Sequence, residues 1–189
     1  IQDPEESVRR SAASALGWVA VSRYGTLKHA FIEALNDPET GLSTTVVESD
    51  DPQLRRQMAR TLGYLANPET LQVLKRLSRD EDSDVTREAV LALVSIGTEE
   101  AMNEVQKKLP TASYVVASST LDAVATEFGN TSPELFECIK LALEHDSPQV
   151  RRHAVLMLNG YETKDAADLL AKCTADEDFE VAHRAADLL

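Results

Sequence analysis

Apolar residues recur along most of the chain at intervals of three and four, as Val150, Ala154 and Leu158 illustrate. This spacing places them on one face of an α-helix. One short segment also returns six times: an Asp, small or polar residues, an aliphatic residue, often Arg, and then Ala-x-x-Ala-Leu. Aligned on that aliphatic residue, the copies stand at Val8, Leu54, Val85, Val116, Val150 and Val181. Only Thr44–Val47 is ambiguous with a β-strand, so the pattern predicts an all-α protein.

The spacing of the copies predicts a repeat architecture. Successive intervals are 46, 31, 31, 34 and 31 residues, and four of the five fit one helix-turn-helix unit. A single hairpin cannot bury its own apolar face, so neighbouring hairpins must stack. We therefore expect one repeat domain over residues 1–189, a right-handed α–α superhelix (an α-solenoid) of about six helical hairpins. The apolar stripe still runs at Leu188-Leu189, which indicates a fragment of a longer array.

Helix boundaries are marked by capping residues. The Asp that opens most copies, Asp146 among them, is expected to accept a hydrogen bond from an unpaired backbone N–H group. Glycines that follow the apolar stripes are expected to end the helices in the left-handed conformation; they are Gly17, Gly63, Gly97 and Gly160. A second set of helices is expected between the copies, near residues 27–35, 69–77, 99–109, 133–143 and 164–172.

The first interval is longer than the others because residues 38–50 interrupt the period. Insertions in repeat proteins map to loops, so this segment is predicted to be an irregular insertion loop. It is interpreted either as a loop that contacts a partner or as a linker.

The pattern D-x-x-V-R-x-x-A-x-x-A-L-G resembles the HEAT-like repeat of phycobilisome lyases, and the likeness covers the chain except residues 39–50. The resemblance implies a HEAT-like or armadillo-type solenoid in which the second helix of each hairpin lines the concave surface. The helices that begin near the aligned aliphatic residues would line it here. The resemblance specifies the function much less closely than the fold, because the family includes scaffolds, adaptors and chromophore lyases.

Two enzyme branches of this superfamily fit the sequence poorly. Deoxyhypusine hydroxylase builds a di-iron site from His-Glu dipeptides, and none of the four histidines, His29, His145, His153 and His183, precedes a Glu. DNA glycosylases with HEAT-like repeats carry a basic groove. Here 32 acidic residues oppose 19 basic ones, and the formal charge of −13 repels nucleic acid.

Composition and motifs limit the expected cellular location and the kinds of functional site. Two cysteines, Cys138 and Cys173, lie in apolar helical patterns and do not form a disulfide framework, so a reducing, cytoplasmic location is expected. No apolar run reaches the roughly 18 residues that suggest a membrane span. The sequence contains no Gly-rich phosphate loop, no metal-ligand spacing and no nucleophile elbow, so no catalytic, cofactor or metal site is expected.

Two sets of residues are candidates for partner binding. The alignment places Arg10, Arg56, Arg87 and Arg152 in one register, with His183 and Ser118 at the equivalent positions, and with Arg9, Arg55 and Arg151 one residue earlier. This basic ladder is interpreted either as a grip on carboxylates of an acidic partner or as the structural partner of the repeat Asp residues. Trp18 and Tyr64 align after their glycines, either as anchors for a peptide or planar ligand or as core residues.

The leading hypothesis is a non-enzymatic scaffold that holds a protein or peptide along the concave face of the repeat array. It depends on the repeat pattern and on the missing catalytic groups. The alternative, drawn from family resemblance alone, is a subunit of a phycobilin lyase or a related pigment-handling factor.

Overall fold

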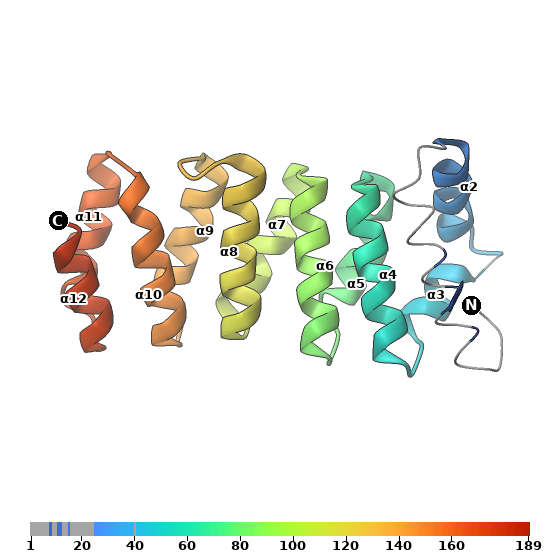
Figure 1. Ribbon diagram of the computed structural model, residues 1–189, viewed down its shortest axis with the longest axis horizontal. Helices are drawn as coiled ribbons and strands as arrows, with labels where there is room; N and C mark the ends of the chain where they lie inside the picture. Colours follow the sequence, from blue (N-terminus) through green and yellow to red (C-terminus); the bar gives the residue numbers. More distant parts are fainter. Residues whose placement is uncertain (1–7, 9–10, 13–14, 16–24, 40) are drawn as a thin grey trace. The chain divides into compact units, whose positions relative to one another are not determined.

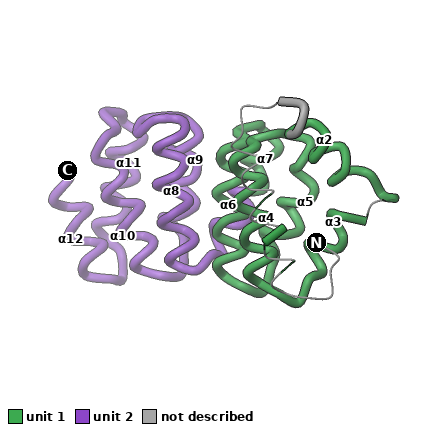
Figure 2. Tube along the Cα trace, turned by 45° about the vertical axis from the view of Figure 1, so that its right-hand side comes forward, with its two compact units in different colours: residues 1–104 green, residues 105–189 purple. Residues whose placement is uncertain are grey.

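The computed structural model describes residues 8, 11, 12, 15, 25–39 and 41–189. The regular structure in these residues is helical, and none of them lies in a strand. The chain divides into two compact units, residues 1–104 and 105–189 (Figure 2). The predicted all-α helical-repeat fold is confirmed, whereas its organisation as one domain stays a prediction.

Unit 1 is built around two neighbouring helices, α4 and α6, with α5 packed against both (Figure 1). Its described helices are α2 (Gly25–Asn36), α3 (Leu42–Val47), α4 (Pro52–Leu65), α5 (Leu71–Leu77) after the 3-10 turn η1 (Pro68–Thr70), α6 (Ser83–Ile96) and the start of α7 (Glu99–Lys108). Leu62, Leu74 and Leu93 are fully buried in this unit. The core therefore takes side chains from both helix sets, as stacked hairpins require.

Unit 2 repeats this arrangement. Its helices are α8 (Tyr114–Phe128), α9 (Pro133–Leu143), α10 (Pro148–Met157), α11 (Lys164–Cys173) and α12 (Phe179–Asp187), with 3-10 turns η2 (Leu109–Thr111) and η3 (Leu158–Gly160). Helix α10 packs against α8, α9 and α12, and α11 packs against α12. The second helix set thus lies where the sequence predicts it.

The aligned aliphatic residues lie in the core at nearly every copy. Five of them are at most 3% exposed: Leu54, Val85, Val116, Val150 and Val181. Val8 is the exception, because 42% of it is exposed. Burial of the same repeat position in both units shows that one hairpin motif builds each of them.

The helix caps follow the prediction in part. Asp82 accepts hydrogen bonds from the N–H groups of Asp84 and Val85 and caps α6 as expected. The prediction for Asp146 is wrong, because α10 begins at Pro148 and its N-cap is Ser147. An extra residue in this loop moves the helix start one position along the chain.

Only one glycine whose helix end is described behaves as predicted. Gly97, with φ of 67°, ends α6 in the left-handed conformation. Gly63 lies inside α4, which ends instead at Ala66 with φ of 46°. Gly160 belongs to the turn η3 and has no left-handed backbone, and Gly17 lies outside the described residues.

The segment expected to be an irregular loop over residues 38–50 contains a helix. Leu42–Val47 forms α3, which packs against α2, α4 and α5, so the prediction is wrong for these six residues. Helical spacing puts Leu42 and Val46 on one face, and Val46 is fully buried. This burial outweighs the strand preference of the β-branched residues Thr44 to Val47.

Candidate functional site

Arg55 of α4 is clamped to the loop before α6. Its Nε and Nη2 donate to the two carboxylate oxygens of Asp80 at 2.6 and 2.8 Å, and its Nη1 donates to the carbonyl oxygen of Ser49. The side chains of Arg55 and Asp80 are only 8% and 7% exposed. This pair therefore ties one repeat to the next and is not available to a partner.

Unit 2 contains the same clamp. Arg151 of α10 donates from Nε and Nη2 to the carboxylate of Asp176, both at 2.8 Å, and from Nη1 to the carbonyl oxygen of His145 at 2.8 Å. Its side chain is 9% exposed and that of Asp176 is 12% exposed. We name the pairs Arg55–Asp80 and Arg151–Asp176 the repeat clamps.

Each clamp Asp has a second partner. Asp80 and Asp176 stand two residues before the N-caps Asp82 and Asp178 and accept their backbone N–H groups at 2.9 Å. At Asp80, burial raises the pKa, but the hydrogen bonds and the Arg55 charge outweigh burial and hold the pKa below its usual value. At Asp176, the hydrogen bond from Arg151 is the main cause of a lowered pKa. Arg55 and Arg151 thus have a structural role, as the structural interpretation of the basic ladder expects, but the Asp that each binds stands two residues before the N-cap and is not the capping Asp itself.

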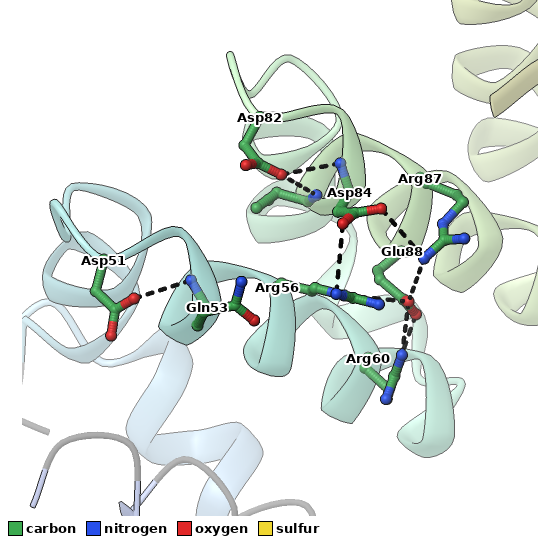
Figure 3. A network of polar contacts seen from close by, with 9 residues as sticks. Asp51, Gln53, Arg56, Arg60, Asp82, Asp84, Arg87 and Glu88 are labelled. Atoms are coloured by element: carbon green, nitrogen blue, oxygen red, sulfur yellow. Dashed lines mark hydrogen bonds and ion pairs between the residues drawn. The ribbon is translucent and has the colours of Figure 1, made fainter. Parts of the chain in front are cut away.

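The predicted ladder residues Arg56 of α4 and Arg87 of α6 lie near Asp84 and Glu88 (Figure 3). Arg56 Nη1 lies 3.4 Å from Asp84 Oδ2, and Arg87 Nη2 lies 3.4 Å from Asp84 Oδ1. Their side chains are 28% and 25% exposed. These arginines are accessible and are held by long ion pairs.

Glu88 is the centre of this surface. Arg60 donates to it at 2.7 Å, and the nitrogens of Arg87 and Arg56 lie 3.3 and 3.6 Å from the same oxygen (Figure 3). Burial alone would raise the pKa of the Glu88 carboxyl, but the Arg60 hydrogen bond and the three positive charges outweigh burial and lower it. Glu88 therefore stays ionised at neutral pH. We name this set, Arg56, Arg60, Arg87, Asp84 and Glu88, the α4–α6 cluster.

A pocket of about 170 Å³ adjoins the cluster, lined by Arg60, Gly63, Tyr64, Glu88, Leu91, Ala92 and Ser95. Tyr64 is 57% exposed, so its interpretation as a core residue is wrong. A Cβ atom on Gly63 would lie 3.1 Å from the Cβ of Ala92. Small residues at these two positions let α4 and α6 approach closely and leave the hollow beside Tyr64 open.

The other predicted site residues are not gathered with these. In unit 2, Arg152 is half-buried and makes no hydrogen bond or ion pair with any residue that the structure describes. His183 of α12 stacks on Phe179 and lies 3.8 Å from Asp187. Arg10 and Trp18 lie outside the described residues.

Sequence reasoning missed Arg60 and Glu88, which organise the cluster. A signal was present, because α4 carries three arginines and no acid, and Arg60 follows Arg56 by one helical turn. Glu88 gave no such signal, since its role arises from the packing of α6 beside α4. Only the structure brings these residues together.

The described residues offer few groups that could bind a metal ion or react. Among residues 25–39, 41–189 and the four other described positions, no group of three His, Cys, Asp or Glu side chains could hold a metal ion. In the same residues, no helix is long and apolar enough to cross a membrane. Burial raises the pKa of the Cys138 thiol to about 12, which keeps it protonated.

The fold and this surface define a helical-repeat protein. The family model of HEAT repeats matches residues 40–125 and 106–189, and the chain belongs to this family. The predicted family resemblance is confirmed. No curated protein matches the chain.

Three solved structures are similar to the chain. The complex of CpcE and CpcF of phycocyanin lyase from Nostoc sp. PCC7120 is 24% identical over 97% of this chain and 71% of that one, with a TM-score of 0.53. An engineered protein is 20% identical over 100% and 91%, with a TM-score of 0.50. A designed armadillo repeat protein is 18% identical over 100% and 94%, with a TM-score of 0.49. At these identities the similarity concerns the fold alone.

Proposed function

We propose that the chain is a non-enzymatic interaction scaffold that binds a protein or peptide on the surface formed by the second helices of its hairpins. The observation that supports this most is the α4–α6 cluster with its pocket and the exposed Tyr64. Accessible arginines and an exposed aromatic ring beside a pocket are typical of energetically important interface residues. The remaining ladder residues, Arg10, Arg152, His183 and Trp18, belong to the same proposal.

A charge-reversal experiment tests this function. The full chain is immobilised, partners are captured from a lysate, and mass spectrometry quantifies them for the wild type and for the variant with Arg56→Glu, Arg87→Glu and Arg152→Glu. We expect the variant to lose the partner, because reversed charges repel what the arginines attract. Circular dichroism checks that the variant is folded. Equal capture of the partner by a folded variant would reject the proposal for this surface.

A pigment-handling role is the second candidate, and the similarity to the phycocyanin lyase complex is its only support. The pocket of about 170 Å³ is smaller than the roughly 300–1,000 Å³ of pockets that hold drug-sized ligands. A bilin added to the full chain would show a shifted absorption band if it bound. An unchanged spectrum at high protein concentration rejects this candidate.

A further inference from the structure

The internal ion pairs of the α4–α6 cluster leave part of its hydrogen-bonding capacity unused. Arg87 makes its contacts through Nη2 alone, and its Nε is buried with no hydrogen-bond partner in the described part of the chain. Arg56 makes contacts through Nε at 3.6 Å and Nη1 at 3.4 Å, and its Nη2 has none with a described residue. The buried Nε of Arg87 is out of reach of a partner, so a further acceptor would bind the Nη1 group of Arg87 and the Nη2 group of Arg56, which donate to no described residue.

The charges of the cluster favour an anion. Three guanidinium groups surround two carboxylates, which leaves one net positive charge in a chain whose formal charge is −13. Glu88 is the deeper acid, with a side chain only 10% exposed beneath the arginines. The other acid, Asp84, is 51% exposed beside Arg56 and Arg87, so an approaching partner meets this carboxylate together with the guanidinium groups. One added carboxylate would neutralise the net positive charge that remains.

The adjoining pocket favours an apolar side chain. It shares Arg60 and Glu88 with the cluster, and uncharged residues supply the rest of its lining. Its volume of about 170 Å³ is close to that of an engineered protein cavity of about 150 Å³ that binds benzene. The exposed ring of Tyr64 at its edge offers a face for an aromatic or large aliphatic group.

We propose that the α4–α6 cluster and its pocket bind an acidic peptide segment in which a carboxylate side chain neighbours an aromatic or large aliphatic one. The carboxylate binds Arg87 and Arg56, and the apolar side chain enters the pocket against Tyr64. Glu88 is a positioning residue that holds the three guanidinium groups together. This inference rests on the proposed scaffold function and names the chemistry of the partner at one place.

Fluorescence anisotropy with defined peptides tests the inference. The probe is a fluorescein-labelled synthetic peptide with Asp residues on both sides of one Phe, and its controls replace every Asp by Asn or by Lys. We expect the full chain to bind the acidic peptide at least about tenfold more tightly than either control, with affinity falling as salt is added. Equal or tighter binding of a control peptide overturns the inference.

Variants locate the binding. Arg87→Gln is expected to weaken binding of the acidic peptide about tenfold, the effect of losing a charge-assisted hydrogen bond. Arg76→Gln is the matched control: this arginine lies on α5 of the same unit, is 47% exposed and pairs with Glu48 outside the cluster, so the change should leave binding unchanged. Circular dichroism confirms that each variant is folded. Unchanged binding by folded Arg87→Gln, or an equal loss with Arg76→Gln, contradicts the assigned site.

A double-mutant cycle tests the pocket. Tyr64→Ala in the protein and Phe→Ala in the peptide should each weaken binding several-fold, and together little more than either alone, since both remove one contact. Additive effects would place the Phe elsewhere. If charge reversal abolishes partner capture while no acidic peptide binds, this inference fails and the scaffold function stands. If charge reversal has no effect either, both fail.

Discussion

The two units share a buried arginine–aspartate clamp and differ in the charged pairs between their second helices. Each has a repeat clamp with the same geometry, Arg55–Asp80 in unit 1 and Arg151–Asp176 in unit 2. On the surface of the second helices, Arg60 of α4 meets Glu88 of α6, whereas Asp122 of α8 meets His153 of α10 at 3.0 Å. These two pairs occupy equivalent places in the repeat, but the acid stands on the second of the two helices in unit 1 and on the first in unit 2.

The difference separates the contacts that build the repeat from those that vary between repeats. A buried arginine must keep its acid, because an unpaired charge in the interior is costly. An exposed ion pair contributes little, so a pair such as Asp122–His153, whose Asp side chain is 62% exposed, can change without harm to the fold. The second-helix surface is therefore where the two units differ in charge, and in unit 1 it carries Arg56, Arg60 and Arg87.

The largest expected effect comes from breaking a clamp. Arg55→Ala or Arg151→Ala should lower the free energy of unfolding by about 3–5 kcal/mol, because each leaves a buried carboxylate without its partner. Denaturant titration followed by circular dichroism measures the loss. Arg56→Ala and Arg152→Ala, one residue further along, are the controls and should cost less than about 1 kcal/mol. Equal costs for clamp and control variants would show that the clamps do not stabilise the repeats.

A smaller effect is expected from acid. Because the pKa values of Asp80 and Asp176 are lowered on folding, their contribution is present above the unfolded pKa of about 3.9 and is lost as pH falls through the folded values. The wild type should therefore lose stability below about pH 4. Asp176→Asn should be less stable at pH 7 but should lose less on acidification, as denaturant titrations at several pH values would reveal. A variant with the wild-type pH dependence would contradict the assignment.

The smallest effect tests the equivalence of the two surfaces. The double variant Asp122→Arg with His153→Glu gives unit 2 the charge pair of unit 1. We expect the free energy of unfolding to change by less than about 1 kcal/mol, because Asp122 is 62% exposed and His153 is 25% exposed. A loss of several kcal/mol in denaturant titration would mean that these positions are not interchangeable.

Much of the fold was predictable because the repeat signal is periodic. The aligned aliphatic residues, the second helix set and the N-caps Asp51 and Asp82 follow from local spacing and capping chemistry. The errors lie where packing overrides a local rule. Thr44–Val47 has strand-forming residues and yet lies in the helix α3. Gly63 was expected to end a helix, but it lies inside α4, where its small size lets α6 approach closely.

The site was predictable only in part. Arg56, Arg87 and Tyr64 were found because they recur in register with the repeats. Arg60 and Glu88 were missed, since the first is outside that register and the second belongs to another helix. The sequence also left the role of Arg55, the residue before Arg56, undecided. The structure shows it buried against the loop that contains Asp80.

The sequence by itself determined that this protein is a stack of amphipathic hairpins, because helical spacing and capping act over only a few residues. Tertiary structure alone decided which arginines are locked and which are accessible. Arg55 and Arg56 are neighbours in the chain, yet one is buried against Asp80 and the other lies on the α4–α6 surface. Successive helical side chains point about 100° apart, so which of them is buried depends on the helix that packs alongside.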